Sequence, residues 1–137
     1  ARETVQRATL SGRVAVVDDE PAVAQFMQEL LAGWGLAVTA FADGAAALRA
    51  LEEGAAFDIV ITDQTMPGMT GIALAQAVHA RHAHLPVVLY TGRADAVASA
   101  DLDRAGVRAL LSKPIDAQAL LAILRANLPL RASGEAP

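Results

Sequence analysis

The sequence lacks several features that would each point to a class of protein. It has no cysteine, which excludes disulfide bonds and thiolate metal ligands and suits a reducing compartment. It has no run of Lys and Arg residues and a net charge of −4, which argues against a nucleic-acid-binding surface. Its longest uncharged apolar stretch, residues 30–42, is too short to span a bilayer and is interrupted by Gly33 and Gly35. No signal-peptide pattern opens the sequence, so these absences together predict a soluble domain.

Apolar runs bounded by turn residues alternate with amphipathic segments along the 137 residues, a length that fits one domain. The runs predict five strands, at residues 13–19, 36–41, 57–62, 86–91 and 107–112. After the first strand, Glu20 and Pro21 can open a helix, since proline is tolerated in a first helical turn. The spacing of its apolar residues predicts a single stripe facing the core, made of Val23, Phe26, Met27, Leu30, Leu31 and Trp34.

Four further helices are predicted after the later strands. Residues suited to N-caps start three of them, namely Asp43, Thr70 and Asp116. The second helix should end near residue 54, the third should cover residues 71–82, and the last should turn its leucines inward at residues 120, 121, 124 and 128. A fourth, alanine-rich helix is expected around residues 95–104. It carries only Val97 and Leu102 as sizeable apolar residues, so we expect it to have low local stability.

Five consecutive strand–helix units predict a parallel sheet with right-handed crossovers and helices on both faces. At this length we expect an α/β fold of the flavodoxin-like doubly wound (βα)5 type, with strand order 2-1-3-4-5. The domain should span residues 13–128. Residues 1–12 and 129–137 are small and polar without periodicity, and are predicted to be a linker and a C-terminal tail. Because the sequence starts at Ala1 rather than at methionine, we expect it to belong to a longer chain.

Polar side chains stand at the ends of four of the predicted strands. Asp18 and Asp19 end the first strand and Asp63 ends its expected neighbour, so three carboxylates should crowd one edge of the sheet. Like charges that close raise one another's pKa values, and a magnesium ion would relieve the repulsion. Thr91 and Lys113 end the fourth and fifth strands at the same edge. A hydroxyl and an ammonium beside carboxylates suit a phosphoryl group, which a carboxylate nucleophile can also carry covalently.

Four motifs at these strand ends, VVDDE, ITDQTMPGMTG, LYTG and LLSKP, resemble the receiver domain of two-component response regulators. The resemblance covers about residues 13–128. It implies that Asp63 accepts a phosphoryl group from the phosphohistidine of a histidine kinase or phosphotransfer protein. It also implies that Thr91 and Lys113 contact the phosphoryl oxygens, and that the Lys113–Pro114 peptide bond is cis.

The same resemblance implies a Mg²⁺ cofactor. Its ligands would be Asp18, Asp19, the Asp63 carboxylate and the backbone carbonyl of Thr65. We therefore expect a phosphoacceptor that helps to catalyse its own phosphorylation, rather than an enzyme with turnover.

Other interpretations of these residues are weaker. An aspartate-nucleophile phosphatase would be expected to carry a second acid two residues after the nucleophile, where Thr65 stands. A nucleotide-binding enzyme should contain a glycine-rich phosphate loop, and neither of the usual motifs occurs. The three histidines His79, His82 and His84 could suggest zinc. We interpret them instead as a solvated helix end, since no acid or cysteine nearby completes a site.

The loop sequences DQTMPGMTG and ALLSKP favour a receiver attached to a hybrid sensor histidine kinase. The alternatives are a receiver cut from the output domain of a response regulator and an interaction domain that works without phosphorylation. In every case we expect a cytoplasmic domain without direct contact to nucleic acid or membrane. The parent chain could be a histidine kinase and could be anchored in a membrane.

Overall fold

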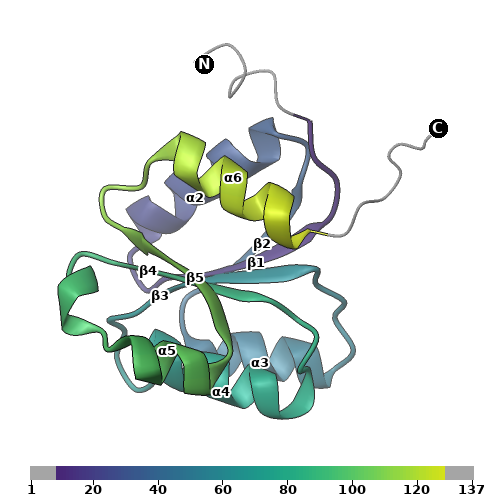
Figure 1. The fold of residues 1–137 in the computed structure, drawn as a ribbon. Helices are drawn as coiled ribbons and strands as arrows, with labels where there is room; N and C mark the ends of the chain where they lie inside the picture. The colour runs from purple at the N-terminus through teal and green to yellow at the C-terminus, as the bar shows by residue number, and fades with distance from the viewer. Residues whose placement is uncertain (1–8, 129–137) are drawn as a thin grey trace.

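Five parallel strands form one sheet in the order β2-β1-β3-β4-β5 in a computed structural model that describes residues 9–128 (Figure 1). The strands are β1 (Arg13–Val17), β2 (Ala37–Phe41), β3 (Ile59–Asp63), β4 (Val87–Thr91) and β5 (Val107–Ser112). This confirms the predicted fold class and strand order. The predicted strand bounds differ from the observed ones by at most two residues, as at residues 57–62 against Ile59–Asp63.

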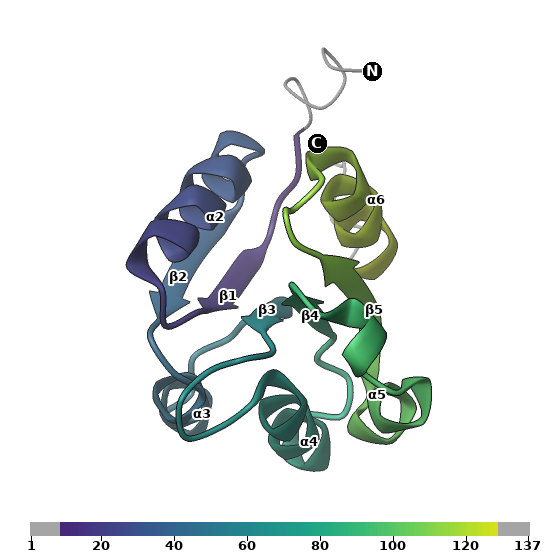
Figure 2. The ribbon, with the colours of Figure 1, turned by 90° about the vertical axis from the view of Figure 1, so that its left-hand side faces the viewer.

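Helices cover both faces of the sheet, as Figure 2 shows. One face carries α2 (Pro21–Gly33) and α6 (Ala117–Asn127), and the other carries α3 (Gly44–Glu52), α4 (Gly71–Arg81) and α5 (Ser99–Ala105). Two apolar clusters fill the two layers. Met27 and Leu124 belong to the first cluster, and Leu74 and Val78 belong to the second. Successive residues of a central strand therefore face the two clusters in turn.

Burial follows the place of each strand in the sheet. All five residues of β3 and of β4 are buried, and so are four of the five residues of β1. The edge strands β2 and β5 are only partly buried. The near-continuous apolar runs of the central strands are the sequence counterpart of this double burial. The three central strands therefore form a rigid base whose carboxyl ends carry the polar residues singled out above.

The three predicted side-chain caps are confirmed. The carboxylate of Asp43 accepts a hydrogen bond from the amide of Ala46, and the hydroxyl of Thr70 accepts one from Ala73. The carboxylate of Asp116 accepts one from the amide of Gln118. Each cap satisfies a backbone donor that the first helical turn leaves without a partner.

The predicted core-facing stripe of the first helix is wrong at one position. Phe26 is exposed, with 50% of its surface accessible, whereas Met27, Leu31 and Trp34 are buried. Ala24 takes the remaining place against the sheet. A helix that packs on one sheet face buries a limited arc, and six large residues spread over a wider arc than α2 can cover.

The single helix predicted around residues 95–104 is also wrong. The chain forms a short 3₁₀ turn, η1 (Ala94–Ala96), and then the seven-residue α5. Between them, Val97 and Ala98 are extended. No side chain caps either piece. With few large apolar groups to anchor it to the sheet, the segment does not sustain one continuous helix.

Part of the predicted linker is attached to the domain. The amide of Leu10 donates to the carbonyl of Trp34, and the Leu10 side chain packs against the first apolar cluster. The tail at residues 129–137 and residues 1–8 of the linker lie outside the described residues. Within residues 9–128, no helix is long and apolar enough to cross a membrane.

Candidate functional site

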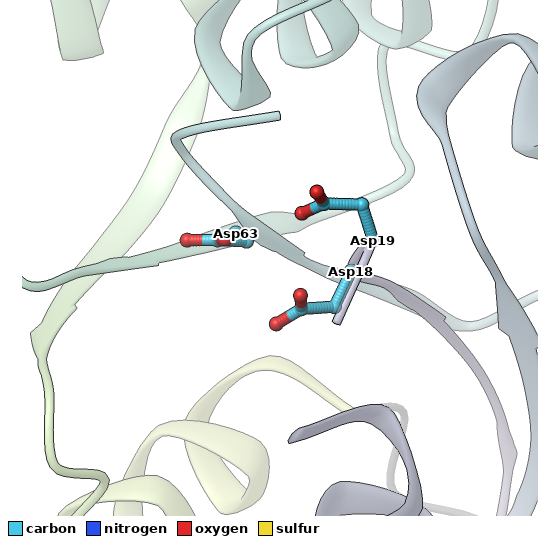
Figure 3. A group of neighbouring side chains, drawn as sticks. All are labelled: Asp18, Asp19 and Asp63. Atoms are coloured by element: carbon cyan, nitrogen blue, oxygen red, sulfur yellow. The ribbon is translucent and has the colours of Figure 1, made fainter. Parts of the chain in front are cut away.

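Three acids meet where β1 and β3 end. Asp18 and Asp19 directly follow β1, and Asp63 is the last residue of β3, the strand paired with β1. One carboxylate oxygen from each residue lies within 4.8 Å of the other two, and the three groups extend to the same side (Figure 3). Asp18 and Asp63 are buried and Asp19 is exposed. The predicted crowding of carboxylates at this edge is therefore present.

Lys113 contacts the central acid of this cluster. Its Nζ lies 3.3 Å from Oδ1 of Asp63, and 28% of the lysine side chain is exposed against 5% of the aspartate. Burial raises the pKa of Asp63, and the nearby Asp18 raises it further, while Lys113 lowers it. The lysine thus offsets only part of the cost of ionising Asp63 in this place. A bound cation would offset the repulsion between Asp63 and the neighbouring acids.

The loop after β3 is fixed by its backbone. The amide of Thr65 donates to the Asp63 carboxylate, which lowers the pKa of Asp63. The side-chain oxygen of Gln64 accepts a hydrogen bond from the amide of Ile72, and the Gln64 carbonyl accepts one from Gly71. The start of α4 is thereby held against the end of β3, where Asp63 lies.

Thr91 and Lys113 end neighbouring strands, as predicted. Thr91 is the last residue of β4 and is 2% exposed. Its carbonyl accepts a hydrogen bond from the amide of Lys113, and its hydroxyl accepts one from the amide of Arg93. The Lys113–Pro114 bond is cis, which confirms the prediction. The strand ends thus place the hydroxyl and the ammonium on the same edge as the acids.

Sequence reasoning missed Tyr90, whose hydroxyl donates a hydrogen bond of 2.6 Å to Oδ2 of Asp18. Burial raises the pKa of Tyr90 far above its ordinary value, and the bond to Asp18 adds to this, so the hydroxyl stays a donor. The other oxygen of Asp18 accepts a bond from the amide of Glu20. The only signal in the sequence was a hydroxyl-bearing aromatic one position before Thr91, within an apolar strand.

The structure does not bring the three histidines together as a group of ligands. Among residues 9–128, the only group of three or more potential ligands that come together is Asp18, Asp19 and Asp63. His79 lies near the end of α4, where its ring packs beside Gly106, and His82 caps the same helix. The interpretation of these residues as a helix end is thus consistent with their positions.

The acid cluster fits a hard divalent cation. It supplies three carboxylate oxygens within 4.8 Å of one another, and the pKa of Asp63 is raised by burial and by Asp18. Oxygen ligands from a few carboxylates, completed by water, are the set that Mg²⁺ prefers. No nitrogen or sulfur ligand that would favour a transition metal joins the group.

Gly71, the first residue of α4, has no room for a side chain. A Cβ atom there would lie 2.3 Å from Cδ1 of Leu89 and 2.5 Å from the carbonyl oxygen of Asp63. We expect Gly71→Ala to lower the free energy of unfolding by about 1–3 kcal/mol, because backbone must move to admit the methyl group. Urea denaturation would measure it. Gly33→Ala is the control, since a Cβ at Gly33 meets nothing within 4 Å and alanine favours helices. Equal stability of both variants would contradict the close approach of α4 to the end of β3.

Comparisons with known proteins agree with this geometry. Residues 14–125 match the family model of the response regulator receiver domain. The chain is 37% identical over 118 residues to the transcriptional regulatory protein FixJ of Azorhizobium caulinodans, covering 84% of this chain and 54% of that protein. It is 40% identical over 111 residues to the chemotaxis protein CheY of Pseudomonas aeruginosa, covering 79% of this chain and 89% of that protein.

A solved structure of the same type is the chemotaxis protein CheY4 of Vibrio cholerae. It is 29% identical, with a TM-score of 0.79, and the match covers 87% of this chain and all of that one. The chain spans only about half the length of FixJ. The family match, the parallel fold and the residues at the strand ends agree, and the chain belongs to the response regulator receiver domains of two-component signalling.

Proposed function

We propose that Asp63 is the phosphoacceptor of this receiver domain. The observation that carries the proposal is its position, buried at the end of β3 with Lys113 3.3 Å away and two further carboxylates beside it. The same carboxylate is partly neutralised by the lysine, which permits it to be ionised and hence nucleophilic.

The donor would be a phosphohistidine of a histidine kinase or phosphotransfer protein. A carboxylate oxygen of Asp63 attacks phosphorus and forms a P–O bond. The P–N bond breaks, and its electron pair stays on the imidazole nitrogen of the donor. Lys113 donates to a phosphoryl oxygen and Thr91 offers its hydroxyl to another, both from strand ends that the sheet holds in place.

Asp18, Asp19, Asp63 and the backbone carbonyl of Thr65 are proposed to hold Mg²⁺. When bound, the ion offsets the negative charge of the acids and of the phosphoryl oxygens. The backbone amide of Thr65 donates to the Asp63 carboxylate and so restrains one of the residues that would hold the ion.

The parent chain is proposed to be a hybrid sensor histidine kinase, on the basis of the loop sequences after β3 and β5. The response regulators among the relatives support the alternative, a receiver joined to an output domain. Reading the gene on both sides of this chain distinguishes them. A transmitter domain upstream supports the first, and a DNA-binding or other output domain downstream supports the second.

The phosphoacceptor proposal is tested with the wild-type protein, Mg²⁺ and a small phosphodonor such as acetyl phosphate. Intact-mass analysis should show the gain of one phosphoryl group that is stable to acid and labile to base. Hydroxylamine should convert the modified residue to a hydroxamate, and peptide mapping should locate it at Asp63. Modification at another residue, or none, would contradict the proposal. The absence of any modification would instead favour an interaction domain that works without phosphorylation.

A further inference from the structure

One buried side chain, Tyr90, contacts both the acid cluster and the lysine. Its hydroxyl donates to Oδ2 of Asp18 at 2.6 Å. The Nζ of Lys113 lies over its ring, 5.4 Å from the centroid. Tyr90 is fully buried and belongs to the apolar cluster under α2 and α6. A single aromatic ring therefore lies between the residue proposed to hold metal and the residue proposed to hold phosphoryl oxygens.

The hydroxyl of Tyr90 has a defined hydrogen-bond partner in the buried core. A buried phenol without a hydrogen-bond partner would lose free energy relative to water, so a core position of this kind favours phenylalanine unless a partner is present. The structure supplies that partner in Asp18, 72 residues away in the sequence. The amide of Glu20 holds the opposite oxygen of the same carboxylate. Both Asp18 oxygens are thus oriented, and each retains one free lone pair.

The face of the Tyr90 ring also has a defined partner, the ammonium group of Lys113. An ammonium over an aromatic face is attracted to it, and more strongly where water is partly excluded. The Lys113 side chain is 28% exposed and extends across the ring to reach Asp63. Because Tyr90 precedes Thr91 and its register partner on β3 is Asp63, it lies at the centre of the edge that carries the site.

We propose that Tyr90 is a positioning residue that orients the Asp18 carboxylate for the cation through its hydroxyl and supports Lys113 through its ring. This inference rests on the proposed magnesium site. Groups that hold a metal-binding carboxylate by a hydrogen bond change metal affinity by about 10- to 100-fold when removed. We therefore expect Tyr90→Phe, which keeps the ring and loses the hydroxyl, to bind Mg²⁺ about tenfold more weakly.

The first part of the test is a titration with MgCl₂ in which backbone amide chemical shifts report binding. It compares four proteins, namely wild type, Tyr90→Phe, Asp18→Asn and the double variant. In Asp18→Asn, the further change Tyr90→Phe should alter the dissociation constant less than twofold, since the carboxylate that the hydroxyl orients is gone. Val88→Ala is the matched control. Val88 lies two residues earlier on the same face of β4 in the same cluster, so this variant loses core packing without touching Asp18. It should be less stable than wild type and bind Mg²⁺ with unchanged affinity.

The lysine arm needs no metal. Lys113 is the only lysine in the sequence, so lysine labelled with ¹³C at the ε-carbon gives one side-chain signal. In wild type and Tyr90→Phe, the ε-methylene protons should be shifted upfield by the ring below them. In Tyr90→Leu, which removes ring and hydroxyl, the signal should return toward the random-coil position.

The outcomes separate this inference from the function on which it rests. Tenfold weaker Mg²⁺ binding in Tyr90→Phe, lost in the Asp18→Asn background, together with the expected lysine shifts, supports it. If wild type binds Mg²⁺ and folded Tyr90→Phe binds it with the same dissociation constant, the inference is wrong and the magnesium site stands. A wild-type protein that binds no Mg²⁺ overturns the magnesium site and this inference with it.

Discussion

Asp63→Asn should abolish phosphoryl uptake and, in the absence of metal, make the domain more stable at neutral pH. The first effect follows because an amide is not a nucleophile for phosphorus. The second follows because burial, with Asp18 beside it, raises the pKa of Asp63 more than Lys113 lowers it. The folded protein therefore gives up free energy to keep this carboxylate ionised. An uncharged amide of nearly the same shape removes that cost, and we expect a gain on the order of 1 kcal/mol.

The pH dependence of stability tests separately whether ionised Asp63 destabilises the folded protein. The unfolded chain loses its proton near the ordinary value of 3.8, whereas the folded protein holds it to higher pH. Between these two values the folded state binds more protons, so this residue makes stability fall as pH rises. The advantage of Asp63→Asn over wild type should thus be present at pH 7.5 and shrink as pH is lowered toward 3.8.

Urea denaturation in EDTA would measure the difference in stability and its dependence on pH. Asp103→Asn, which removes an exposed acid on α5, is the charge-matched control. Addition of Mg²⁺ should reverse the order. Wild type gains about 2.7 kcal/mol at 100 times its dissociation constant, and the variant, with one carboxylate fewer, gains less. If the metal-free variant is less stable than wild type at pH 7.5, Lys113 outweighs burial and the reasoning is wrong.

The fold was open to prediction because the physics that selects it is visible in the local sequence. Central strands of a parallel sheet are buried on both faces, so they appear as apolar runs such as that of β3. Once the strand order follows from the alternating units, residues far apart in the sequence, such as Asp18 and Asp63, must end side by side. The acid cluster is therefore a consequence of topology, and the capping residues fix the starts of three helices by local hydrogen bonds.

The features that escaped prediction depend on contacts between elements. The bond between Tyr90 and Asp18 requires the tyrosine to face α2 and α6 and to reach across the end of β3, and neither is encoded within its own strand. Phe26 fits the helical period of α2, yet the sheet offers no surface at its angle. The break before α5 depends on how few side chains anchor that segment. Hydrophobic periodicity and residue propensity cannot predict these contacts between elements, because they describe one helix or strand at a time.

Lys113→Met should separate the phosphoryl chemistry from metal binding by moving them in opposite directions. Nζ of Lys113 lies 3.3 Å from Oδ1 of Asp63, where it would face a phosphoryl group carried by that carboxylate. Removal of one such donor from a preorganised site typically costs 10²- to 10³-fold in rate. We expect a fall in the rate of phosphorylation of about 100-fold, measured by intact mass against time with a small phosphodonor.

The affinity for Mg²⁺ should increase in Lys113→Met, whereas the rate of phosphorylation falls. The ammonium competes with a divalent cation for the Asp63 carboxylate, so its loss leaves the cluster more negative. The pKa of Asp63 should rise, because Lys113 is the largest of the influences that lower it. Because its acid cluster carries one compensating positive charge fewer, we expect Lys113→Met to bind Mg²⁺ several-fold more tightly than wild type at pH 7.5.

Lys113→Arg is the matched control for charge. It restores a cation but replaces the compact ammonium by a planar guanidinium, so Mg²⁺ affinity should return to the wild-type value while phosphorylation recovers only in part. Weaker Mg²⁺ binding in Lys113→Met would mean that the lysine organises the acids rather than competing for them. An unchanged rate of phosphorylation would mean that the ammonium is not directed at the phosphoryl group. The 3.3 Å contact would then serve only to offset the charge of buried Asp63 in the resting domain.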